Sequence, residues 1–101
     1  LTDDDITGIA AIFQSWYPQY GWVFGVPSGG ERLASALALD RTEGSNIVLI
    51  VDDVLTTGKS MEEAKSYVGE DKICYGAVIF ARAESWPDWI RPLFVLADND
   101  L

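Results

Sequence analysis

The sequence predicts an α/β fold in three layers, in which a mostly parallel sheet of about four strands is flanked by helices. Two observations carry this prediction. Short apolar runs of strand length alternate along the chain with segments whose apolar residues recur at helical spacing. The run Ile47–Val51 is apolar without interruption, which is typical of a parallel strand that is buried on both faces. The length of 101 residues suits a single domain over positions 1–101.

The first half of the chain reads as helix, strand, helix and loop. Residues Leu1–Tyr17 are predicted to form a helix that ends at Pro18, because their apolar residues fall on one face and three Asp residues suit its positive end. A short buried strand is expected at Trp22–Val26, and a second helix at Glu31–Leu39. The polar segment Asp40–Ser45 is expected to be a loop.

The second half repeats the alternation. The strand Ile47–Val51 is followed by an expected loop, Asp52–Lys59. Ser60 is expected to cap the next helix, with Glu63 as its capping-box partner, and this helix runs to about Val68. The later segments are predicted to be a strand at Ile73–Ala81, an irregular stretch at Ser85–Arg91 and a last strand at Leu93–Leu96.

The charge and composition exclude several kinds of site. A formal net charge of −9 argues against a nucleic-acid partner bound through its phosphates. The chain has no His and a single Cys, so neither an intrachain disulfide nor a transition-metal cluster is expected. No apolar run is long enough for a membrane span and no signal pattern opens the chain, so a cytoplasmic protein without a membrane partner is expected.

The clearest chemical signal follows the strand Ile47–Val51. Adjacent carboxylates at the end of a buried strand are costly unless they accept hydrogen bonds or face a cation, and Asp52 and Asp53 stand there. The residues that follow them, Thr56–Ser60, supply hydroxyls, a glycine and amides at a helix N-terminus, which together can hold an oxyanion. A carboxylate pair for a diol beside a phosphate cradle describes a ribose 5-phosphate.

The segment VLIVDDVLTTGKS, Val48–Ser60, resembles the signature with which phosphoribosyltransferases bind phosphoribosyl pyrophosphate (PRPP). The resemblance implies that Asp52 and Asp53 are the catalytic pair and contact the ribose hydroxyls. It implies that the 5-phosphate is wrapped by six residues, namely Leu55, Thr56, Thr57, Gly58, Lys59 and Ser60. It further implies Mg²⁺ as the cofactor, held mainly by substrate and water near the two Asp residues.

A second loop, made of Pro27, Ser28, Gly29 and Gly30, lies ahead of the Asp pair in the sequence. By itself this segment is a turn. The longer stretch VFGVPSGGERLASALA resembles the family's strand, loop and helix, in which the loop binds pyrophosphate, often through a strained peptide bond. The resemblance therefore assigns Pro27–Gly30 to the pyrophosphate of PRPP.

The chain resembles a minimal or truncated member of this family, closest to its orotate branch in the Thr56–Ser60 loop. Family enzymes place another strand and a long mobile loop between the first helix of this unit and the PRPP strand, whereas only Asp40–Ser45 is present here. The segment that covers the base could come only from Leu1–Gly21 or Ser85–Leu101. The implied activity is transfer of the phosphoribosyl group of PRPP to a nucleobase or similar small molecule.

Other interpretations remain open. The same fold could serve as a non-catalytic PRPP or nucleotide sensor, or as a structural module that forms a homodimer through its aromatic residues. Trp86 and Trp89 could stack on a base, but packing against the core is favoured. The sequence argues against two other classes of protein. A Walker A loop would need Gly where Asp53 stands, and a receiver domain would need a Lys after Asp98.

Overall fold

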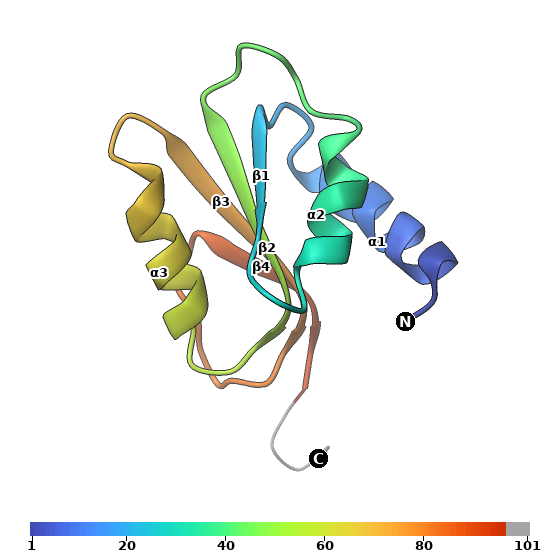
Figure 1. Cartoon of the computed structure of the whole chain (residues 1–101). Coiled ribbons are helices and arrows are strands. Elements are labelled where there is room, and N and C mark those ends of the chain that lie inside the picture. The colour runs from blue at the N-terminus through green and yellow to red at the C-terminus, as the bar shows by residue number, and fades with distance from the viewer. Residues whose placement is uncertain (97–101) are drawn as a thin grey trace.

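The computed structural model describes residues 1–96, which form a four-stranded parallel sheet with the strand order β1-β2-β3-β4 (Figure 1). The strands are β1 (Trp22–Gly25), β2 (Ile47–Leu55), β3 (Ile73–Ala81) and β4 (Ile90–Val95). The helices are α1 (Asp3–Trp16), α2 (Glu31–Ala38) and α3 (Lys59–Val68). None of these helices is long and apolar enough to span a membrane. The predicted α/β class and the parallel sheet are confirmed, whereas the predicted domain end at Leu101 lies outside the described residues.

Helix α1 begins two residues later than predicted because Thr2 caps it. The Thr2 side chain accepts a hydrogen bond from the Asp5 backbone N–H at 3.1 Å, and the Asp5 carboxylate accepts one from the Thr2 N–H at 2.9 Å. These reciprocal bonds form a capping box, which satisfies two of the N–H groups that a helix start leaves without partners. The cap fixes the helix start at Asp3.

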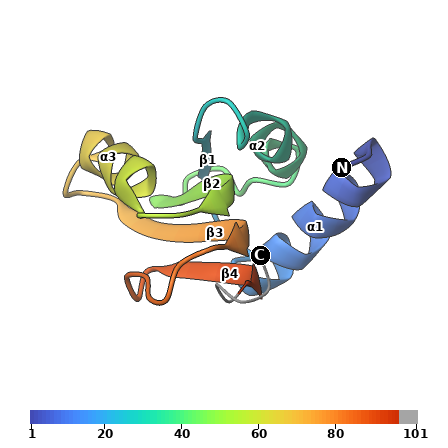
Figure 2. The same cartoon turned by 90° about the horizontal axis from the view of Figure 1, so that it is seen from below.

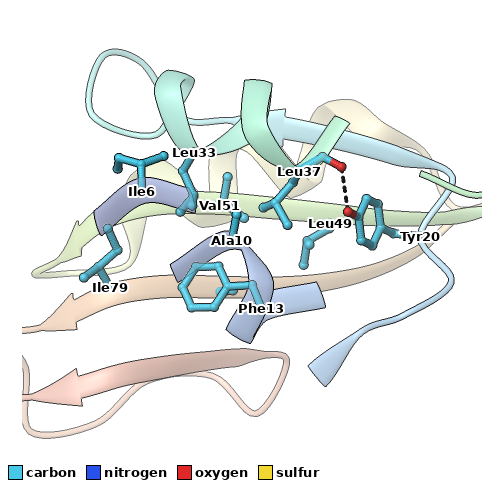
Figure 3. Close-up of a cluster of buried hydrophobic side chains, with 10 residues drawn as sticks. Ile6, Ala10, Phe13, Tyr20, Leu33, Leu37, Leu49, Val51 and Ile79 are labelled. Atoms are coloured by element: carbon cyan, nitrogen blue, oxygen red, sulfur yellow. Dashed lines mark hydrogen bonds between the residues drawn. The ribbon is translucent and has the colours of Figure 1, made fainter. Parts of the chain in front are cut away.

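The helices cover the sheet from both sides, which confirms the three predicted layers (Figure 2). On one face, α1 and α2 enclose a buried cluster that includes Phe13, Leu33, Leu37, Leu49 and Val51 (Figure 3). On the other face, α3 encloses a second cluster formed by Val26, Val48, Ile50, Leu55, Met61, Ala64, Val78, Ala81 and Ile90. From Val48 to Val51, alternate residues of β2 contribute to the two clusters, as the period of a doubly buried strand requires.

The two helical crossovers have opposite hands. The strand order advances in one direction from β1 to β3, while α2 and α3 lie on opposite faces of the sheet (Figure 2). The β2–α3–β3 crossover is right-handed, as about 98% of such connections are, and β1–α2–β2 is left-handed. From the same position α2 would make a right-handed crossover to a strand on the free side of β1. The left-handed connection therefore results from the direct passage from α2 to β2 through Asp40–Ser45.

The last strand begins earlier than predicted. β4 starts at Ile90, so it takes in the end of the stretch that was expected to be irregular, and it ends at Val95 instead of Leu96. Pro92 pairs with Val78 inside this strand. A proline is tolerated there because β4 is an edge strand whose outer side needs no backbone donor. Because a proline usually argues against a strand, the residues just before Pro92 had been predicted to be irregular.

Trp89 packs against the sheet, as the sequence had favoured. A Cβ added to Gly76 would lie 2.8 Å from the Trp89 ring, so the glycine leaves room for the indole on β3. The indole N–H donates to the Glu62 carboxylate at 2.9 Å, and the Lys65 ammonium lies 4.9 Å from the ring centroid. Trp86 is partly buried against the second cluster, which α3 encloses. Trp89 is thus held in the protein's own packing, by contacts to β3 and α3.

Candidate functional site

The two loops singled out in the sequence lie at one edge of the sheet, where β1 and β2 end. The strands are parallel neighbours with Gly25 opposite Val51, and the Val26 N–H donates to the Val51 carbonyl oxygen at 2.9 Å. The loop Pro27–Gly30 therefore leaves β1 beside the Asp pair of β2. Carboxyl ends of adjacent strands are where sheets of this class bind ligands. The fold thus brings the predicted pyrophosphate loop and the predicted ribose residues together.

The Asp pair lies within a strand and not in the loop that the sequence predicted. β2 continues beyond Val51 to Leu55, because Asp52, Val54 and Leu55 still pair with β3. Each carboxylate is fixed locally: the Asp53 N–H donates to Asp52 Oδ1, and the Val54 N–H donates to Asp53 Oδ1, both at 2.8 Å. The pair is therefore held on a rigid element, which keeps a binding group in a fixed position better than a loop does.

The turn from β2 into α3 forms a small polar cavity of about 40 Å³, lined by Asp52 and residues 54–61. α3 begins at Lys59, and its N-cap is Gly58, whose φ of +81° is the left-handed region that favours glycine. The prediction that Ser60 caps this helix with Glu63 is wrong, because Ser60 already lies inside the first turn. The Thr57 hydroxyl instead accepts from the Lys59 N–H at 3.2 Å.

The helix start gives this cavity its chemical character. The first N–H groups of a helix have no partner within the helix, and its dipole places partial positive charge there. The Thr56–Gly58 turn leads directly to these donors, and the six predicted residues Leu55–Ser60 all line the cavity. The cavity has the size for one small group and the donors for an anion. The cavity is too small for a whole nucleotide.

The second loop is packed closely against β2. A Cβ on Gly29 would overlap the Asp53 carboxyl group, and a Cβ on Gly30 would overlap the Val51 carbonyl oxygen. Both glycines are therefore required for the close approach of this loop to the strand. The Pro27–Ser28 peptide bond is cis. Asp52 lines the cavity before α3 while Asp53 contacts Gly29, so the Asp pair joins the two loops.

Gly25 is a site residue that the sequence reasoning missed. A Cβ there would overlap the Gly30 backbone and would lie 2.8 Å from Ala34 Cβ, so this glycine lets α2 start close to β1. The available signal was a glycine at the end of an apolar strand, which often marks a close backbone approach. Arg82 also lies at this edge, since its N–H donates to the Leu55 carbonyl oxygen at 2.8 Å.

Burial raises the pKa of Asp52 to about 7, and the neighbouring Asp53 carboxylate adds to this rise. A carboxyl group with this pKa holds a proton near neutrality that an unfolded Asp would release. A bound cation or ribose hydroxyls would favour its charged form instead. Carboxylate oxygens are the ligands that Mg²⁺ prefers, so Asp52 and Asp53 fit a magnesium ion held chiefly by substrate and water. Within residues 1–96, no three acidic or Cys side chains cluster as a complete metal site.

The raised pKa predicts how stability depends on pH. Because the folded protein holds the Asp52 proton more tightly, its free energy of unfolding should fall as pH rises from about 4 to 7. Asp52→Asn removes this penalty, and should raise the free energy of unfolding at pH 8 by about 1–2 kcal/mol after allowance for water at the loop. At pH 5, where more of the folded protein holds the proton, the gain should be smaller. Urea denaturation at both pH values measures it, with exposed Glu70→Gln as control; an equal gain at both would contradict the assignment.

Comparisons with known proteins give the fold. No protein-family model matches the sequence, and no curated protein matches it either. Among solved structures, a phosphoribosyltransferase from Corynebacterium diphtheriae has a TM-score of 0.70 and 20% identity, over 95% of this chain and 76% of that one. A purine phosphoribosyltransferase from Pyrococcus horikoshii has a TM-score of 0.67 and 22% identity, over 93% and 82%. The Helicobacter pylori xanthine-guanine-hypoxanthine phosphoribosyltransferase has a TM-score of 0.61 and 19% identity, over 89% and 85%.

These three proteins match almost the whole length of the described sheet and helices, and the fold is the one that the motif at Val48–Ser60 had implied. The identities are low, so the likeness is one of backbone architecture. The predicted preference for the orotate branch, and the roles of the individual site residues, stay predictions. The four parallel strands, the helices on both faces and the two loops at one edge make this chain a protein with the phosphoribosyltransferase fold.

Proposed function

We propose that this chain binds PRPP at the edge formed by Pro27–Gly30 and Asp52–Ser60, and that it transfers the phosphoribosyl group to a nucleobase. The observation that carries the proposal is the junction of the two loops at the Asp pair. Asp52 lines the cavity of the predicted 5-phosphate loop, and Asp53 contacts Gly29 of the predicted pyrophosphate loop. If the 5-phosphate of PRPP lies in the first loop and its pyrophosphate in the second, the ribose between them would lie over the two carboxylates.

In the proposed reaction a ring nitrogen of the base attacks C1 of the ribose, and the C1–O bond to pyrophosphate breaks. The bonding electrons leave with pyrophosphate, and the base loses its N–H proton to solvent. Positive charge develops on the ribose in between, so nearby carboxylates stabilise it electrostatically. The protein's contribution is mainly to hold the reactants in line, through groups fixed on β2 and at the start of α3. Magnesium would neutralise the leaving pyrophosphate.

PRPP binding should require magnesium. The ligand is a polyanion and the protein has a net charge of −9, so a bare complex brings many negative charges together. We expect PRPP to bind at least about tenfold more tightly with excess Mg²⁺ than with excess chelator, a difference of about 1.4 kcal/mol. Calorimetric titrations measure both affinities, with inorganic sulfate as a control anion. Equal affinity in the two conditions would overturn the magnesium part of the proposal.

A second candidate function, PRPP sensing without transfer, is favoured by the position of Asp40–Ser45. Its Thr42 N–H donates to the Tyr20 carbonyl oxygen at 2.7 Å, and the Gly21 N–H donates to the Ile47 carbonyl oxygen at 2.9 Å. The segment therefore lies where β1 and β2 begin, at the opposite edge from the site. It cannot close over the reacting ribose from there. A protein that binds PRPP but transfers it to none of a panel of bases would be such a sensor.

A homodimer and a cytoplasmic location are parts of the proposal. The strand β1 offers a contact surface, because it is an edge strand without charged residues, and its Trp22 and Phe24 are 52% and 42% exposed. Uncharged edges of this kind tend to pair with other strands. Sedimentation analysis at several concentrations would show whether such pairing occurs in solution.

A further inference from the structure

A second cavity lies at the opposite edge of the sheet from the two site loops. It has a volume of about 310 Å³, opens to solvent, and is lined by the segment Trp16–Tyr20, by Ile47 at the start of β2 and by Tyr75 of β3. Small-molecule sites in proteins begin at about this size, roughly 300 Å³. The proposed PRPP site does not use any of these residues. The cavity is therefore a candidate for an independent ligand.

The aromatic side chains of this cavity are held in place by contacts within the protein. The Tyr20 hydroxyl donates to the Leu37 carbonyl oxygen at 2.6 Å, and its side chain is fully buried (Figure 3). The rings of Tyr17 and Tyr75 are stacked, with centroids 4.9 Å apart and an interplanar angle of 16°. The Arg91 guanidinium lies 4.0 Å from the centroid of Trp16. A preformed wall of this kind loses little freedom when a ligand binds.

The lining defines the chemistry of the ligand. Of the four aromatic lining residues, Trp16, Tyr17 and Tyr75 are at least partly exposed while Tyr20 is buried behind them. No lining residue is charged, so flat aromatic rings are the groups that the cavity can contact best. No lining residue would offer a charged ligand an ionic partner in return for its lost hydration, and Arg91 outside the lining is already held against the Trp16 ring. Hydrogen-bonding groups do exist in the lining, as the Gln19 amide and the Tyr17 phenol. Burial raises the pKa of the Tyr17 phenol, so it remains a neutral donor.

We propose that this cavity, bounded by Trp16–Tyr20, Ile47 and Tyr75, binds a small, uncharged, planar aromatic molecule with one polar N–H or carbonyl group. Such a ligand places its ring against Trp16, Tyr17 and Tyr75, and its polar group toward Gln19 or Tyr17. The site is separate from the edge that holds Asp52 and Asp53. Its occupation does not depend on whether the chain binds PRPP.

Indole is a suitable probe, because it is flat, neutral and carries one N–H. In ¹H–¹⁵N correlation spectra, we expect indole to shift the amide signals of residues 16, 17, 19, 20, 47 and 75 and to leave those of 52–60 unchanged. The anion indole-3-carboxylate should bind at least tenfold more weakly. Shifts confined to other residues, no saturable shifts, or equal binding of the anion would each overturn the proposal.

Two variants test the cavity in different ways. Tyr75→Ala removes one aromatic wall, and Ile47→Phe fills part of the space; each should weaken indole binding at least tenfold. The matched control is Tyr67→Ala, which removes a tyrosine that is 86% exposed on α3 and should leave binding unchanged. Circular dichroism establishes that each variant is folded, and Ile47→Phe keeps the test decisive if Tyr75→Ala unfolds. Unchanged binding in a folded cavity variant would overturn the proposal.

Discussion

The purified chain should release pyrophosphate from PRPP and a base at least about 100-fold more slowly than the Helicobacter pylori enzyme with its own bases. The reason is the open site. The cavity before α3 has only about 40 Å³, and Asp40–Ser45 lies at the far edge of the sheet. A loop that closes over the substrate excludes water and completes the catalytic site. Each ~1.4 kcal/mol of transition-state stabilisation that is lost without it costs a factor of ten in rate.

A coupled pyrophosphate-release assay measures this rate, with and without a panel of bases, at several protein concentrations. Release that does not depend on the base would indicate hydrolysis by the water that an open site admits. A rate per chain that rises with protein concentration would indicate that a second copy supplies the cover. Fast, base-dependent release by a demonstrated monomer would show that the fold needs no lid, and would contradict this prediction.

The double variant Asp52→Asn with Asp53→Asn should bind PRPP about 10–100-fold more weakly, while its affinity for inorganic phosphate changes less than about threefold. The carboxylates would accept hydrogen bonds from the ribose hydroxyls, and losing a bond to a charged group costs about 1.5–3 kcal/mol. Phosphate would contact the amides before α3, which the substitutions leave in place. Amide side chains keep the oxygen atoms that accept from the Asp53 and Val54 N–H groups, so the strand end should keep its geometry.

The matched control is Glu70→Gln with Asp71→Asn, which removes the same two charges from exposed positions outside the site. Reduced general repulsion should make this control bind PRPP as well as the parent or slightly better. Calorimetry with Mg²⁺ present gives the affinities, and urea denaturation verifies folding. If the double Asp variant binds PRPP like the parent, the Asp pair is not the ribose site.

Several elements could be predicted because their signals are local. The apolar run Ile47–Val51 and the run Ile73–Ala81 gave a buried parallel pair, and the structure pairs them in register from Ile47 with Ile73 onward. The helical spacing of Ile6, Ala10 and Phe13 gave α1, and these three residues are buried. Such patterns work because the period of a helix or strand is fixed by backbone geometry, whatever the tertiary contacts are.

Boundaries were less predictable where polar residues continue an element. Asp52 and Asp53 looked like the start of a loop, yet the pairing of Asp52–Leu55 with β3 keeps them in β2. Ser60 looked like a cap, yet the left-handed Gly58 ends the turn two residues earlier. In both cases the choice depends on hydrogen bonds to a distant segment or on one backbone angle, and neither leaves a pattern in side-chain polarity.

The sequence alone determined the α/β class, the alternation of elements and the turn at Pro27–Gly30, because turn residues and hydrophobic periodicity are local features of the sequence. Only the tertiary structure decided that Gly29 lies against the Asp53 carboxyl group, and that Asp40–Ser45 lies at the edge away from the site. It alone decided that the β1–α2–β2 crossover is left-handed, and that Trp16–Tyr20 and Tyr75 line a second cavity. These relations join residues far apart in the chain, and they are set by the packing of whole elements, which the local pattern does not encode.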